Sequence, residues 1–159
     1  MWRGTVVSLH IASTVGAPMQ SVQSVHAVAG KGLEGDRYFK EEGFYSWFRG
    51  PLREISLIEA EVLDRLEHDH HLVLEPGETR RNIATRGVPL GHLIGRAFRV
   101  GSVVLQGVEI SEPCQHLVEL TGKKLLLSSL VHRGGLHAQI VTDGVIQLHD
   151  IIEPVEVSW

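Results

Sequence analysis

Cys114 is the single cysteine of the chain, and it stands in the stretch "EISEPCQHLVEL", residues 109–120. Pro113 rigidifies the backbone just before it, where a predicted strand ends and a predicted helix begins. A helix N-terminus lowers the pKa of a thiol and exposes it to ligands. The thiolate could then act as a nucleophile, carry a persulfide or bind a soft metal. The alternative is an unreactive core residue, because free cysteine is often buried.

The stretch "HRGG" covers His132, Arg133, Gly134 and Gly135. Two adjacent glycines after an arginine let backbone N–H groups turn toward one point, and such nests bind anions. The guanidinium could add a bidentate contact to a phosphate. A tight surface turn with a solvated arginine is the alternative interpretation.

Further arginines occupy loop-like or glycine-rich surroundings in the motifs "GLEGDR", residues 32–37, and "RRN", residues 80–82. The chain as a whole is acidic, with a formal net charge of -4. A phosphate-bearing ligand would explain why basic residues gather in such places, whereas solvated loops are the alternative. The arginines concerned are Arg37, Arg80, Arg81, Arg86 and Arg133.

The histidines carry less information. The run "HDHH", residues 68–71, resembles a metal cluster, but it lies at the end of an amphipathic helical pattern and predicts a solvated helix end. His116 is two residues from Cys114, and His132 and His137 flank the glycine turn. A Cys–His hydrolase pair is possible in principle, yet no strong hydrolase signature frames the cysteine.

The first half of the chain alternates β patterns with loops. β-Branched residues predict strands over residues 5–12 and 21–28. Five glycines and clustered charges predict a long loop over residues 30–51. Residues 54–72 predict a short strand that runs into a helix, with Ile58, Val62, Leu63 and Leu66 at helical spacing.

The second half predicts bent β-structure and one more helix. Glycines punctuate short apolar runs between residues 76 and 113, which is typical of a closed or strongly bent β-structure. Residues 114–131 have helical apolar spacing, with a probable break at Gly122. Residues 136–157 return to strands, and "TDGV", residues 142–145, predicts a hairpin turn. The expected fold is mainly β, a barrel with two or three helices.

Composition limits the class of protein. The 159 residues fit one domain, residues 1–159, and the acidic balance argues against a generic nucleic-acid partner. One cysteine cannot form an internal disulfide, and the N-terminal stretch does not read as a signal peptide. No apolar run approaches the roughly 20 residues of a membrane span. We therefore expect a cytoplasmic protein without a membrane partner.

Five motifs, taken in order, resemble the MOSC domain, the C-terminal domain of molybdenum cofactor sulfurase. The resemblance runs from roughly Ser24 to Pro154, and the lone Cys114 stands at the family's cysteine position. No motif is decisive alone, but five in the family's order make a specific match. They are "GLEGDR", "PGETRRNIATRG", "G-x-x-F-R-V-G", "EPC" and "HRGGLHAQIVTDGVI".

The resemblance implies a closed, strongly bent MOSC-type β-barrel of the compact stand-alone bacterial type. Larger relatives add a second N-terminal β-barrel or a pyridoxal-phosphate sulfurase domain, and this chain contains neither. Relatives of the compact type are linked to reduction of N-hydroxylated compounds on a molybdenum cofactor. The family was also proposed to carry sulfur as a cysteine persulfide. The implied partners are an electron-donor protein for the reductase, or a cysteine desulfurase for the sulfur carrier.

The resemblance also assigns roles. Cys114 would bind molybdenum as a thiolate, and Asn82 and Thr85 would orient a polar substrate or a metal-bound oxo group. Phosphate and pterin of the molybdenum cofactor (molybdopterin) would be held by one basic, glycine-containing set of residues. That set is Arg37, Arg81, His132, Arg133, Gly134 and Gly135.

The sequence departs from the family at two places. His149 stands in "LHDII" where the family commonly has the glycine of a Gly-Asp turn, which makes the local turn uncertain. The stretch "EEGFYSWFRGP" lacks the histidine- and glycine-rich pattern that many relatives show after "GDR". Pocket shape, and therefore the substrate, could differ there.

Overall fold

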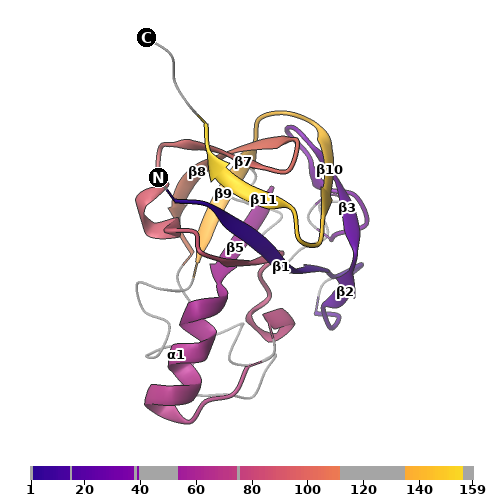
Figure 1. The fold of residues 1–159 in the computed structure, drawn as a ribbon. Helices are drawn as coiled ribbons and strands as arrows, with labels where there is room; N and C mark the ends of the chain where they lie inside the picture. Colours follow the sequence, from indigo (N-terminus) through magenta and orange to yellow (C-terminus); the bar gives the residue numbers. More distant parts are fainter. Residues whose placement is uncertain are drawn as a thin grey trace.

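The computed structural model describes residues 2–14, 16–37, 39, 54–74, 76–111 and 135–155. Seven strands of an eight-stranded sheet form a closed, mostly antiparallel barrel, because Gly4 and Thr5 pair with Ile152 and Ile151 (Figure 1). Around the barrel they run in the order β11 (Ile151–Pro154), β7 (Ala97–Val100), β8 (Val103–Ile110), β9 (Leu136–Ile140), β5 (Ile55–Glu59), β6 (Ile83–Arg86) and β1 (Gly4–Ile11). The predicted mainly β fold with a closed barrel is thus confirmed.

A smaller sheet stands beside the barrel. Strand β3 (Ser24–Val28) pairs with β10 (Gly144–Gln147) on one side and with β4 (Gly32–Leu33) on the other. Strand β2 (Gln20–Val22) extends the barrel sheet by pairing with the end of β1. The predicted strand over residues 21–28 is therefore two short strands, and the predicted loop over residues 30–51 contains β4.

One predicted turn is wrong in its pairing. Residues 142–145 were expected to form a hairpin, but β9 pairs with β8 and β5 whereas β10 pairs with β3. The turn therefore carries the chain from the barrel to the smaller sheet. The Asp143 side chain accepts a hydrogen bond from the amide of Ala29 at 2.7 Å, which holds this crossing in place.

The predicted strand-to-helix unit is confirmed. Strand β5 continues directly into helix α1 (Ala60–His70), which lies below the barrel in Figure 1. Side chains of β5 alternate: Leu57 belongs to the barrel core, and Ile58 packs with Leu63 and Leu66 under the helix. Ile58, which we expected at helical spacing with Val62, Leu63 and Leu66, therefore lies in the strand and not in the helix. No described helix has the length and apolar character needed to cross a membrane.

Glycines bend the barrel where other side chains would not fit. A Cβ on Gly107 would overlap the carbonyl of Leu93, next to the register shift between β8 and β9. Gly101 adopts φ 60° in the turn between β7 and β8. His149 adopts φ 70°, the left-handed conformation that glycine prefers, so the turn forms despite the substitution. The predicted helix over residues 114–131 lies outside the described residues.

Candidate functional site

Arg37 of the "GDR" motif is buried and anchored to the end of β1. Its backbone amide donates to the carbonyl of Ala12 at 2.7 Å, and the Asp36 carboxylate accepts from the amide of Ala12 at 3.0 Å. The guanidinium forms an ion pair with Asp36 at 3.3 Å and lies 3.6 Å from the sulfur of Met19. Only 6% of Arg37 is exposed, so this cation is part of the scaffold at the end of the strand.

The adjacent arginines of "RRN" point to different segments. A short 3-10 helix, η2 (Pro76–Thr79), precedes them, and Arg80 adopts φ 65° immediately after it. The guanidinium of Arg80 donates to the carbonyl of Ala17, between β1 and β2. Arg81 instead donates to the carbonyl of Ser111 at 3.4 Å, at the end of β8. The side chain of Arg81 therefore lies beside the C-terminal end of β8.

Ser111 and Gly135 form a junction at which two strands of the barrel meet. The amide of Ser111 donates to the carbonyl of Gly135 at 2.8 Å, so the end of β8 and the start of β9 are joined. Gly135 adopts φ 112°, and a Cβ there would overlap the carbonyl of Leu57 in β5. Glycine is thus required by close packing as well as by its backbone conformation. The hydroxyl of Ser111 is buried without a hydrogen-bond partner in the part of the chain that the structure describes.

Asn82 and Thr85 belong to the framework beneath this junction. The side chain of Asn82 accepts from the amide and hydroxyl of Ser56 at 3.0 and 3.2 Å and donates to the carbonyl of His10 at 3.1 Å. Thr85 is fully buried, and its hydroxyl lies 3.5 Å from the carbonyl of Ile58. These contacts show that both side chains link neighbouring strands. Their roles in orienting a substrate stay predictions.

His10 is a buried polar residue that the sequence analysis missed. Its ring nitrogens lie 2.8 Å from the hydroxyl of Ser8 and 3.4 Å from that of Ser21. Gly77 of η2 packs against the ring, where a Cβ would come within 3.2 Å of Nδ1. Burial lowers the pKa of His10 below its ordinary value. The only sequence signal was a histidine inside a strand pattern, which does not show which way the side chain faces.

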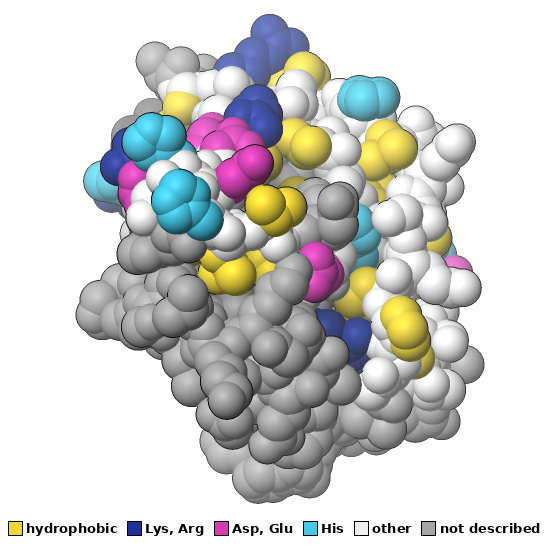
Figure 2. Space-filling view, turned by 90° about the horizontal axis from the view of Figure 1, so that it is seen from below, with side chains coloured by type: hydrophobic (Ala, Val, Ile, Leu, Met, Phe, Trp, Pro, Cys, Tyr) yellow, Lys and Arg dark blue, Asp and Glu magenta, His cyan; other side chains and the backbone are white. Residues whose placement is uncertain are grey.

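The described residues bring Arg37 and Arg81 to the same end of β1. The backbone amide of His10 donates to the carbonyl of Asn82 at 2.8 Å. The carbonyl of Ala12, two residues later, accepts from the backbone amide of Arg37. We call the set Arg37, Arg81, Ser111 and Gly135 the basic corner. Figure 2, seen from below, shows a dark blue patch and a cyan patch that are set back from the surrounding surface.

Several predicted site residues lie outside the described residues: Cys114, His116, His132, Arg133 and Gly134. His137 lies in β9 opposite Ser56. His68 is exposed at the end of α1, and His71 caps the helix in a left-handed conformation, as expected for a solvated helix end. Among the described residues no group of three His, Cys, Asp or Glu side chains could hold a metal.

Together these contacts describe a closed β-barrel with two arginines held at the same end of β1. The chain belongs to the MOSC domain family, whose profile matches residues 46–153. No curated protein matches the sequence significantly.

Solved structures show the same fold. The YuaD protein from Bacillus subtilis is 18% identical with a TM-score of 0.80, and the match covers 98% of this chain and 100% of that one. YiiM from Geobacillus stearothermophilus is 15% identical with a TM-score of 0.75, covering 96% and 75% of the two chains. YiiM from Escherichia coli is 18% identical with a TM-score of 0.68, covering 99% and 71%. At these identities the likeness is one of fold.

Proposed function

We propose that this MOSC domain binds a molybdenum cofactor at the basic corner and reduces N-hydroxylated compounds there. The observation that carries the proposal is the hydrogen bond from Arg81 to the carbonyl of Ser111. This bond fixes the cation of Arg81 beside Ser111, which stands three residues before Cys114 in the sequence. Arg133 comes two residues before Gly135, which is bonded to Ser111. Cys114 and Arg133 therefore each stand within three residues of this junction in the sequence, which supports one shared site for the predicted thiolate and the predicted anion-binding turn.

The residues of the basic corner fit a cofactor that carries a phosphate. Arginine presents several N–H donors in a planar fork that matches phosphate oxygens. The buried hydroxyl of Ser111, without a partner among the described residues, can donate one more hydrogen bond. Arg37 is buried and held by Asp36, so it supports this corner as part of the scaffold. The MOSC family is associated with binding of the molybdenum cofactor, and this donor set agrees with such a ligand.

In this proposal the protein binds and orients, and the cofactor supplies the redox chemistry. Reduction of an N-hydroxyl group consumes two electrons and two protons, breaks the N–O bond and releases one water molecule. A molybdenum centre, when bound, would supply the electrons and recover them from an electron-donor protein. Arg81, Arg133 and the glycine turn would hold the anionic end of the cofactor. Cys114 would be the soft ligand that fixes the metal end.

Metal analysis and pterin fluorescence on protein made in a molybdenum-replete host test the first half of the proposal. We expect both molybdenum and pterin in the wild type. Arg81→Gln should retain about tenfold less cofactor, because a charge-assisted contact to phosphate is lost. The matched control is Arg65→Gln, which removes an exposed arginine of α1 that pairs with Asp69 in its own helix. Equal cofactor content in all three proteins would contradict a cofactor site at the basic corner.

Cys114→Ser tests the second half. With an artificial electron donor, cofactor-loaded wild type should reduce a hydroxylamine-type substrate, and the serine variant should lose this activity while remaining folded. A hydroxyl is a poorer ligand for a soft metal than a thiolate. Unchanged reduction by the serine variant would overturn the role of Cys114 as an essential ligand.

A sulfur carrier is the alternative outcome of the same experiment. A carrier would take labelled sulfur from a cysteine desulfurase onto Cys114 and lose that ability in the serine variant, because a hydroxyl cannot hold a persulfide. If loaded wild type fails to reduce the substrate but accepts labelled sulfur, the reductase proposal is rejected in favour of the carrier.

A further inference from the structure

A pocket opens at the end of β1 that lies away from the basic corner. It has a volume of about 630 Å³ and is walled by the segment before β1, by the 3-10 helix η3 (Leu90–His92) with the turn after it, and by the ends of β7 and β11. This volume falls within the range of small-molecule sites, roughly 300–1,000 Å³. The pocket is therefore large enough to enclose a ligand of one or two rings.

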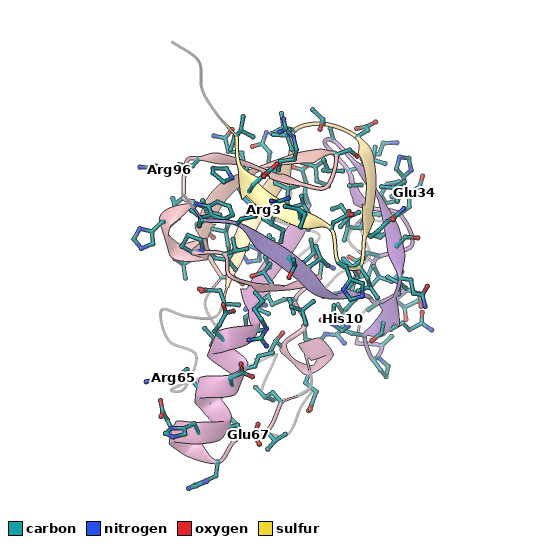
Figure 3. The ribbon with its side chains drawn as sticks, in the orientation of Figure 1. Arg3, His10, Glu34, Arg65, Glu67 and Arg96 are labelled. Carbon is teal, nitrogen blue, oxygen red and sulfur yellow. The ribbon has the colours of Figure 1, made fainter. Side chains whose placement is uncertain are left out.

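The pocket is separate from the basic corner. Trp2 precedes β1, and Ala12, which anchors Arg37, follows it. The eight residues of β1 lie between them, and a strand of that length spans about 26 Å. Figure 3 shows Arg96 of the pocket and His10 near the basic corner at opposite ends of the barrel. One small ligand cannot touch both places.

The lining combines apolar walls with the side chains of an arginine and a histidine. Trp2 is half-buried and packs against the barrel core, so part of its ring is fixed while the rest faces the pocket. Leu93, Ala97 and Pro154 complete the apolar wall. Arg96 and His92 are the ionisable residues among the described residues that line the pocket, and neither makes a side-chain ion pair in the described part of the chain.

The backbone of this pocket is held by hydrogen bonds. The amides of Leu93 and Arg96 donate to the carbonyls of Leu90 and Leu93, both at 3.0 Å. The amide of Gly95 donates to the carbonyl of Gly107 at 2.9 Å, which ties the turn to β8. A site whose walls are already fixed loses less conformational entropy when a ligand binds.

We propose that this pocket binds a small carboxylate that carries an aromatic ring. The ring would stack on Trp2 and contact Leu93 and Pro154, because aromatic pairs prefer such offset contacts. The carboxylate would accept hydrogen bonds from the guanidinium of Arg96, the group best matched to it in shape and charge. No acidic side chain among the described lining residues would repel it. This inference is independent of the proposed cofactor site.

The test uses two probes with the same ring, indole-3-acetate and its uncharged amide, titrated into ¹⁵N-labelled protein and followed by NMR. We expect saturable shifts for indole-3-acetate at Trp2, Leu93 and Ala97 in the millimolar range, with the amide binding several-fold more weakly. Ala97→Leu should abolish binding of both probes by filling the pocket. The spectrum of each variant reports whether it is folded.

Arg96→Gln should weaken indole-3-acetate about fivefold and leave the amide unchanged, because only the carboxylate uses the charge. The matched control is Arg99→Gln, an exposed arginine of β7 that does not line the pocket. Absence of saturable shifts at these residues would overturn the pocket as a ligand site. Equal affinity for the two probes, or an equal effect of the two arginine variants, would overturn the assignment of a carboxylate ligand.

Discussion

The side-chain oxygen of Asn82 lies 3.0 Å from the amide nitrogen of Ser56 and 3.2 Å from its hydroxyl, and accepts hydrogen bonds from both. The amide group of the same side chain donates to the carbonyl of His10 at 3.1 Å. One buried side chain thus connects β5 with β1 at the start of β6. This framework sets the position of Arg81, the preceding residue in the chain and the cation of the proposed cofactor site.

Asn82→Ala should destabilise the protein by about 2–4 kcal/mol, because it leaves the buried amide of Ser56 and the carbonyl of His10 without their partner. Urea unfolding followed by circular dichroism measures the loss. Thr85→Val is the matched control: the Thr85 hydroxyl makes a marginal contact at 3.5 Å, so its loss should cost less than about 1 kcal/mol. If the two variants cost the same, the connecting role of Asn82 is wrong.

His10 should make stability depend on pH. Burial lowers the pKa of His10 in the folded state, so the unfolded chain binds a proton more readily. Its contribution to stability is complete above the ordinary histidine value of about 6.5 and is lost as pH falls toward the lower folded value. We therefore expect the free energy of unfolding to decrease as the pH is lowered through this window.

A His10→Gln variant keeps hydrogen-bonding groups without a titration and should flatten that part of the pH profile. The control is His92→Gln, which replaces an exposed histidine. Urea unfolding at a series of pH values compares the two. A wild-type profile that keeps its slope in His10→Gln would exclude His10 as the source.

The local patterns were sufficient for the barrel and for the strand-to-helix unit. Ile55–Glu59 and Ala60–His70 follow the two periodicities that a buried strand and an amphipathic helix require. The glycine run indicated bending, and Gly107 shows the cause, since its missing side chain leaves room for the carbonyl of Leu93. The spacing of apolar residues and the positions of glycines are local features of the sequence, so they can be used to predict strands, helices and bends.

Long-range pairing could not be read in the same way. The turn at residues 142–145 has hairpin chemistry, yet β10 finds its partner in β3, more than a hundred residues earlier. The burial of Arg37 follows from Asp36 and Ala12 meeting across separate segments. The position of Asn82 likewise depends on β1 and β5 closing around β6. No local pattern specifies these encounters, because each is decided by the packing of the whole barrel.

His149→Gly should stabilise the protein. His149 holds φ at 70°, where a side chain crowds its own backbone, and the residue is exposed. Glycine relieves this strain but adds freedom to the unfolded chain, so the net gain should be about 0.5–1 kcal/mol. Thermal unfolding measures it.

Gly101→Ala is the opposite test in the turn that faces it. Gly101 adopts φ 60°, and a Cβ there would overlap the carboxylate of Asp150. This variant should lose at least about 1 kcal/mol. A loss of stability in His149→Gly would show that the histidine ring contributes contacts that outweigh its backbone strain.

Glu59→Gln should stabilise the protein at neutral pH. Burial, and secondly the charge of Glu61, raise the pKa of Glu59, so the folded state favours its protonated form. The stabilising contribution of the protonated group is present at low pH and is lost as pH rises through the raised folded value. Glutamine resembles the protonated acid at every pH, so the variant should gain stability near pH 7 and gain nothing near pH 4. Glu109→Gln, on an exposed position of β8, should change stability equally little at both pH values. Urea unfolding at the two pH values decides the matter: a gain in Glu59→Gln that persists undiminished at pH 4 would mean that packing, and not charge, limits stability at this position.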